Sequence, residues 1–159
     1  MTNKRMQKLF GVGPAGVMIS LVLLGLAVWV DRIIGRPVLP VPSALMKAVG
    51  MVLMALGLGI HFWSFWTLRH WWAFDHLCTQ GPFRYFRHPM YAAWITFVAS
   101  GVAFYMNSWV YFLWALALHP IWHRLVEGEE AAMADAFGNA YRDYARQTGR
   151  FFPRIGRGR

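Results

Sequence analysis

The chain alternates long apolar runs with short polar segments. The first run, residues 9–30, holds 22 residues without a charge and ends at Asp31-Arg32. A second run covers 43–66, and 30 residues without a charge or a histidine follow from Pro89 to Leu118, interrupted at Asn107-Ser108. A helix needs about 20 apolar residues to cross a hydrocarbon core of about 30 Å. The pattern therefore predicts transmembrane helices over 9–30, 43–66, 89–106 and 109–126.

Composition supports this assignment. Hydrophobic residues make up 57% of the 159 residues and charged residues 14%, whereas soluble globular domains average about 45–50% and about 25%. The net charge of +9, with a mean hydropathy of +0.35, favours an anionic membrane surface over nucleic acid as the partner. A single cysteine, Cys78, excludes an internal disulfide and a cysteine-based zinc cluster. The sequence thus indicates a one-domain, all-α integral membrane protein with about four transmembrane helices.

The distribution of basic residues orients these helices. Four spans place both termini and the loop 67–88 on one side, which carries 13 of the 16 Lys and Arg residues. Because cytoplasmic loops are enriched in Lys and Arg, both termini are expected in the cytoplasm, with a bacterial inner membrane as the expected location. On that side, residues 127–147 are predicted to form two helices, the first ended by Gly138 and the second capped by Asn139. A basic tail follows over 148–159.

Two polar segments on that side carry candidate chemistry. In GPFRYFRHPMY, residues 81–91, a helix is expected to start at Pro89, directly after Arg87-His88. Helix N-terminal amides and nearby guanidiniums attract an anion such as a carboxylate. Glu129 and Glu130 supply the complement, since acidic groups can hold an ammonium or a sulfonium. Each segment also has a structural interpretation, as an interfacial loop and as a helix start whose dipole favours acidic residues.

Two histidines lie one turn apart in the fourth predicted span. Polar groups inside a span usually line a cavity, so His119 and His123 mark a candidate site, with His123 a candidate catalytic residue. The spacing is compatible with a metal, but the chain has only six histidines and no second cluster, so no metal site is predicted. The arginines after residue 141 are interpreted as a face for anionic lipid headgroups: Arg142, Arg146, Arg150, Arg154, Arg157 and Arg159.

Beyond these local patterns, the C-terminal half resembles the isoprenylcysteine carboxyl methyltransferase family, whose superfamily includes membrane phospholipid N-methyltransferases. The resemblance lies in RHPMY at 87–91, the pair Glu129-Glu130, FGNAYRDY at 137–144 and RFFP at 150–153. It implies S-adenosylmethionine-dependent methyl transfer within a small helical membrane fold, with S-adenosylhomocysteine as product. The C-terminal helices are expected to close the cofactor pocket. The family commonly has glycine at the position of Ala93.

The resemblance also implies roles for individual residues. The expected cofactor-binding residues are Arg87, His88, Pro89, Tyr91, Glu129 and Glu130, with Tyr141 helping to cover the pocket. The expected catalytic residues are Arg87 and His88, together with His123, which is a candidate from its place in the fourth predicted span and not from the resemblance. The expected acceptor is a lipophilic molecule that enters from the bilayer, and no obligate protein partner is inferred. One alternative is N-methylation of phosphatidylethanolamine. A second, from another class, is a non-catalytic membrane scaffold.

Overall fold

A computed structural model describes residues 11–71 and 76–154, and within these ranges it contains helices and two isolated β-bridges. The all-α class predicted from the sequence is confirmed. The elements are α2 (Gly13–Ile33), α3 (Ser43–Trp71), the 3₁₀ turn η1 (Gly81–Arg84), α4 (Pro89–Ala92), the π-helical η2 (Ala93–Val98), α5 (Ala99–Met106), α6 (Trp109–Leu125), α7 (Glu127–Phe137) and α8 (Asn139–Gln147).

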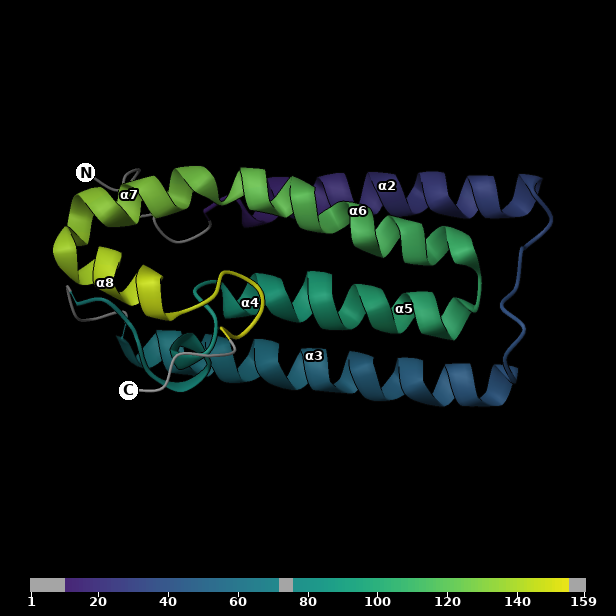
Figure 1. Ribbon diagram of the computed structural model, residues 1–159, viewed down its shortest axis with the longest axis horizontal. Helices are drawn as coiled ribbons and strands as arrows, with labels where there is room; N and C mark the ends of the chain where they lie inside the picture. Colours follow the sequence, from purple (N-terminus) through teal and green to yellow (C-terminus); the bar gives the residue numbers. More distant parts are fainter. Residues whose placement is uncertain (1–10, 72–75, 155–159) are drawn as a thin grey trace.

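The long helices lie side by side in a row (Figure 1). Helix α6 packs against α2 on one side and α5 on the other, and α3 packs along the continuous column of α4, η2 and α5. Helices α7 and α8 extend beyond one end of this row, where α2 begins. The α2–α3 connection and the turn between α5 and α6 lie at the opposite end. The two ends therefore have very different structures.

Among the described residues, three helices are long and apolar enough to cross a membrane: Gly13–Ile33, Ser43–His70 and Pro89–Met106. The first begins at Gly13 rather than at residue 9, and residues 9 and 10 lie outside the described residues. The second continues beyond residue 66, the end predicted for it. Helix α6 has 17 residues and carries His119, His123 and Arg124 in its last turns. The fourth span over 109–126 therefore stays a prediction.

Glycines let α3 approach the α4–α5 column closely. A Cβ on Gly50 would lie 2.6 Å from the carbonyl oxygen of Gly101, and one on Gly57 would lie 2.8 Å from that of Ala93. Small residues of this kind allow close helix contacts in membranes. Ala93 itself is fully buried and opens the π-helical turn. At this contact the glycine is therefore supplied by α3, opposite the alanine.

Asp31 joins the connections at the end opposite α7 and α8. Its side chain is 2% exposed and accepts a hydrogen bond of 2.5 Å from Ser108 Oγ, while Tyr111 Oη lies 3.5 Å from its second oxygen. Asn107 ends α5 with a left-handed φ of 50°, which turns the chain toward α6. The predicted break at Asn107-Ser108 is confirmed. Asp31, which the sequence pattern placed at the edge of a span, is buried and links the end of α2 to Ser108 and Tyr111 by hydrogen bonds.

Two expectations for the C-terminal region are wrong. Residues 148–151, predicted as part of a basic tail, fold back so that Phe151 is 1% exposed. The amides of Arg87 and His88 donate to the carbonyls of Gly149 (2.8 Å) and Arg150 (3.2 Å). Burial of an aromatic ring and pairing of otherwise unbonded amides both favour this return.

Helix α8 also begins differently from the prediction. Gly138 ends α7, as expected, with φ 56° and ψ −127°, a backbone conformation open to glycine. However, Gly138 is also the N-cap of α8, and no side chain caps that helix. Asn139 is its first residue, and the Asn139 Oδ1 atom accepts a hydrogen bond of 3.3 Å from Arg142 Nη1. The carboxamide therefore points toward the next turn instead of the helix start.

Candidate functional site

Segments far apart in the sequence meet where α6 passes into α7. The loop after η1 ends in Arg87-His88, and Pro89 starts α4 at its first residue, where the missing amide hydrogen is tolerated. Helix α7 follows α6 after the single residue Val126, and residues 148–151 return beside the loop. Together these segments form what we call the polar cluster: Arg87, His88, Tyr91, Glu129, Glu130 and Arg150.

Glu130 is the centre of the polar cluster. Arg150 binds it bidentately, with Nε 3.0 Å from Oε1 and Nη2 2.5 Å from Oε2. Arg87 Nε and His88 Nε2 lie 3.0 Å and 3.2 Å from the same Oε1. Burial alone would raise the pKa of Glu130, but hydrogen bonds from His88 and Arg150 and the charges of both arginines lower it to about 2. Glu130 is therefore a partly buried carboxylate held in its charged form.

Glu129 has a separate set of partners. Its Oε1 accepts hydrogen bonds from Tyr91 Oη at 2.9 Å and from the backbone amide of Val12. His88 Nδ1 lies 3.6 Å from its Oε2, so the imidazole stands between the two glutamates. The His88 ring also stacks on the Tyr91 ring, with centroids 5.6 Å apart and an interplanar angle of 11°. RHPMY and the acidic pair, distant in sequence, are thus one site.

Arg87 connects the polar cluster to α8. Its Nη1 donates a 2.8 Å hydrogen bond to the carbonyl of Ala145, near the C-terminus of that helix. Its Nε is buried and, among the described residues, makes no hydrogen bond of good geometry, although Glu130 is close. Tyr144 anchors α8 to the same loop by donating to the Phe83 carbonyl at 2.6 Å, and burial raises the pKa of Tyr144. Helix α8 therefore covers one side of the cluster.

The two histidines of α6 lie next to the returning segment. His123 Nδ1 is 3.0 Å from the carbonyl oxygen of His119, which can only accept, so Nδ1 carries the proton and Nε2 is the basic atom. The ring of His123 meets the Phe151 ring edge-on at 4.9 Å, and the His119 ring stacks on Phe152 at 5.1 Å. Within the described ranges, no three His, Cys, Asp or Glu side chains gather as a metal would require.

Residues 45–140 match the family model described as phospholipid methyltransferase. The chain belongs to this family. A stretch of 84 residues is also 33% identical to the protein-S-isoprenylcysteine O-methyltransferase of Dictyostelium discoideum. The stretch covers 51% of this chain and 35% of that protein, so the chain spans about a third of the length of this relative. The resemblance expected from RHPMY and the acidic pair is confirmed.

In this member of the phospholipid methyltransferase family, Arg150 is a site residue that sequence reasoning missed. It was assigned to a headgroup-binding face, but its side chain is only 20% exposed and it pairs with Glu130. It also donates to the His123 carbonyl at 3.1 Å. The signal that could have identified it was its place in RFFP, at the end of the family-like pattern. Neither Arg150 nor helix α2 lies within the matched residues 45–140.

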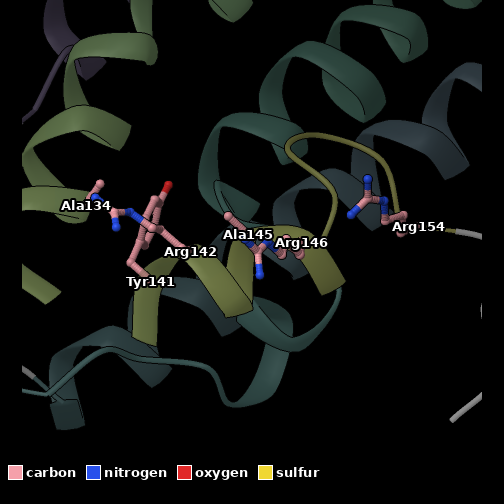
Figure 2. A pocket seen from close by; sticks show the side chains of 6 residues that line it. All are labelled: Ala134, Tyr141, Arg142, Ala145, Arg146 and Arg154. Atoms are coloured by element: carbon pink, nitrogen blue, oxygen red, sulfur yellow. The ribbon is translucent and has the colours of Figure 1, made fainter. Parts of the chain in front are cut away.

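An open groove of about 370 Å³ runs along α8 and is bordered by Ala134 of α7 and by Arg154 (Figure 2). Tyr141 lines this groove and is also close enough to the cluster for Glu130 to affect it. The pKa of Tyr141 is raised to about 12, mainly by burial and then by the negative charge of Glu130. The groove therefore begins beside the polar cluster and continues over a basic surface. Its lining residues are Ala134, Tyr141, Arg142, Ala145, Arg146 and Arg154.

Proposed function

We propose that the chain transfers a methyl group from S-adenosylmethionine to a lipophilic acceptor in the membrane, with S-adenosylhomocysteine as product. The observation that carries this proposal is the convergence of RHPMY and Glu129-Glu130, with His88 held between the two carboxylates. The membership of the phospholipid methyltransferase family and the similarity to an isoprenylcysteine O-methyltransferase support it. We also propose that both termini face the cytoplasm, where the charged cofactor is available.

The polar cluster fits the amino acid end of S-adenosylmethionine. Two arginines and two glutamates balance each other, so a bound zwitterion can exchange partners with them without leaving an uncompensated charge. Arg87 and Arg150 would hold the carboxylate, and the buried Arg87 Nε lacks a well-aligned acceptor for this purpose. Glu129 and Glu130 would hold the ammonium. Pro89 starts the helix beside them, and Tyr141 would cover the outer side.

Bound S-adenosylmethionine supplies an activated sulfonium methyl group, so the protein has mainly to align the acceptor and exclude water. A carboxylate acceptor needs no proton removed, whereas a lipid ammonium must first lose one. The Nε2 atom of His123 would take that proton, since its Nδ1 donates to the His119 carbonyl. Arg87 and His88 would act by orienting the charged groups around the reacting centre. The acceptor would reach the site laterally from the bilayer.

Phosphatidylethanolamine is the second candidate acceptor, because the matched family model is described as phospholipid methyltransferase. We propose in addition that anionic lipid headgroups bind the arginines of the groove on α8. Arg142 and Arg146 project from that helix, and Arg154 lies at the end of the described chain (Figure 2). Such contacts would hold α8 at the membrane surface, near a lipid substrate.

The test is methyl transfer from labelled S-adenosylmethionine by purified full-length protein in detergent and lipid. Farnesylcysteine and phosphatidylethanolamine are offered in parallel to the wild type, Glu130→Ala and Glu127→Ala. Glu127 is the matched control, because it begins the same helix and is exposed. Label in one acceptor, lost only in Glu130→Ala, identifies the reaction and substrate. If the wild type shows no methyl transfer and no cofactor binding, the proposal is contradicted and a non-catalytic scaffold is favoured.

A further inference from the structure

The start of α2 contacts the polar cluster, although it lies outside the matched family region. We propose that the backbone amide of Val12 positions Glu129 for cofactor binding, which makes the beginning of α2 a part of the methyl-donor site. This inference rests on the proposed role of Glu129 in holding the cofactor ammonium. It assigns α2 a function beyond anchoring the chain in the membrane.

The hydrogen bonds of Glu129 carry the first step. The Val12 amide donates to Glu129 Oε1 across 117 positions of sequence, with a nitrogen–oxygen distance of 2.5 Å. Tyr91 Oη donates to the same oxygen at 2.9 Å. Two donors on one oxygen fix the rotation of the carboxylate and leave Oε2 directed toward His88. Without the amide, Tyr91 alone would hold this oxygen.

The helix start supplies a favourable charge as well as a donor. The first amides of a helix have no partner within it, and the helix dipole places partial positive charge there. Val12 is the N-cap of α2, and its own side chain makes no capping hydrogen bond. Glu129, from α7, takes the place of that cap. The two elements are therefore mutually dependent: α2 gains a capping carboxylate, and the carboxylate gains a fixed orientation.

Glycines shape the side of α2 that faces the site. A Cβ on Gly11 would overlap the Glu129 carboxylate, and one on Gly16 would lie 2.5 Å from the Trp122 ring. One on Gly13 would lie 3.4 Å from Tyr91 Oη. Gly11 also has φ +45°, a conformation that other residues rarely adopt. Gly25 of the same helix has nothing within 4 Å of its Cβ position among the described residues, so the crowded glycines are those near the helix start.

Val12→Pro removes the donor with little change to the backbone. The φ of Val12 is −84°, near the range that proline adopts, and the first positions of a helix tolerate proline. Gly11→Ala is a second variant, which displaces the carboxylate and keeps the amide. Gly25→Ala is the matched control, a glycine substitution in the same helix with open space around it. Glu129→Gln and the double variant Val12→Pro/Glu129→Gln complete a double-mutant cycle with the wild type and Val12→Pro.

The experiment measures the Kd for S-adenosylmethionine and the separate KM values for cofactor and acceptor, with thermal unfolding in parallel. Hydrogen bonds to charged groups are the stronger ones, so Val12→Pro and Gly11→Ala should each raise the cofactor Kd about tenfold. The acceptor KM should change less than twofold, as should every parameter in Gly25→Ala. The double variant should bind no more weakly than Glu129→Gln, because both changes act on the same carboxylate.

Unchanged cofactor affinity in both Val12→Pro and Gly11→Ala, with weakened binding in Glu129→Gln, would overturn this inference alone. The inference would also be overturned if the fold-increases in cofactor Kd of the two single variants multiply in the double variant. The Val12 amide would then affect binding independently of Glu129. If Glu129→Gln binds the cofactor as the wild type does, the assignment of the acidic pair fails as well. If Val12→Pro and Gly11→Ala lower the unfolding temperature without changing the cofactor Kd, the start of α2 has a structural role only, and the inference is overturned.

Discussion

Two acidic side chains with contrasting surroundings lie far apart in the fold: Glu130 is in α7, beyond the end of the row where α2 begins, and Asp31 is at the other end of α2 (Figure 1). Glu130 is surrounded by the cationic side chains of Arg87 and Arg150 and by His88. Asp31 accepts hydrogen bonds from hydroxyl groups, and the Arg36 Nε atom lies 3.7 Å away on a side chain that is 70% exposed. Asp31 is also the more deeply buried of the two acids, with 2% of its side chain exposed against 15% for Glu130.

The comparison shows that a buried acid alone does not indicate a binding site. Hydroxyl donors bind Asp31 and connect the end of α2 to the turn between α5 and α6, and the nearby cation Arg36 is largely exposed. The arginines around Glu130 can bind the carboxylate of a ligand in place of Glu130. A zwitterionic ligand supplies that carboxylate, together with an ammonium group for Glu130. We therefore propose that the Glu130 end binds the cofactor and that the Asp31 end contributes to stability.

Removing the charge of Glu130 should have the largest effect on activity. Breaking a buried ion pair by removing one partner typically costs about 3–5 kcal/mol, because the other charge is left uncompensated. Glu130→Gln leaves Arg87 and Arg150 without their shared carboxylate, so kcat/KM for S-adenosylmethionine should fall more than about a hundredfold. Steady-state kinetics in lipid-containing detergent measures this. A loss below about tenfold would remove Glu130 from the centre of the site.

Asp31→Ala should act on stability instead. The change leaves the hydroxyls of Ser108 and Tyr111 without their acceptor, which typically costs about 1–3 kcal/mol. For a chain of this length the unfolding temperature should fall by roughly 2–12 °C. Thermal unfolding in detergent measures the shift, and the cofactor Kd should stay within twofold of the wild type. Weaker cofactor binding without a change in unfolding temperature would contradict the comparison.

Arg150→Lys tests whether geometry as well as charge matters around Glu130. Lysine keeps the positive charge but loses the planar fork that contacts both carboxylate oxygens. We expect a cofactor Kd about tenfold higher, measured by equilibrium binding. Arg146→Lys is the control, since Arg146 is 78% exposed and, among the described residues, forms its ion pair with Asp143 in its own helix. Equal effects of the two substitutions would argue against a specific role for Arg150.

Acid titration should give the smallest effect. The pKa of Glu130 is lowered to about 2, below the ordinary value of 4.5. A lowered pKa in the folded state means that the charged carboxylate stabilises the fold above about pH 4.5. This contribution is lost as the pH falls from there toward 2. Unfolding measured between pH 2 and 6 should show a shallower acid decline in Glu130→Gln than in the wild type, and parallel curves would contradict the assignment.

The long apolar runs made most of the fold predictable. Residues 89–106 were expected as one span ended by Asn107, and the structure has a continuous helical column there. Gly138 was expected to separate α7 from α8, and it does. In each case the information is local, because run length and a single conformational requirement decide where a helix ends.

The parts that could not be predicted depend on contacts between distant segments. Arg150 sits among arginines that look alike in sequence, and only the return of residues 148–151 beside the loop brings it to Glu130. Val12 takes part through its backbone amide, which has no signature in the sequence. Asp31 follows an apolar run as charged residues at the end of a span usually do, and its hydrogen bond with the distant Ser108 depends on the folded structure.

Calorimetric titration of S-adenosylhomocysteine into the wild type, Glu130→Gln and Asp31→Ala tests the central claim most directly. It needs no knowledge of the acceptor and compares the two acidic residues under the same conditions. The account predicts binding by the wild type and by Asp31→Ala with similar affinity, and none detectable in Glu130→Gln. Equal binding by all three proteins, or loss of binding in Asp31→Ala alone, would contradict it.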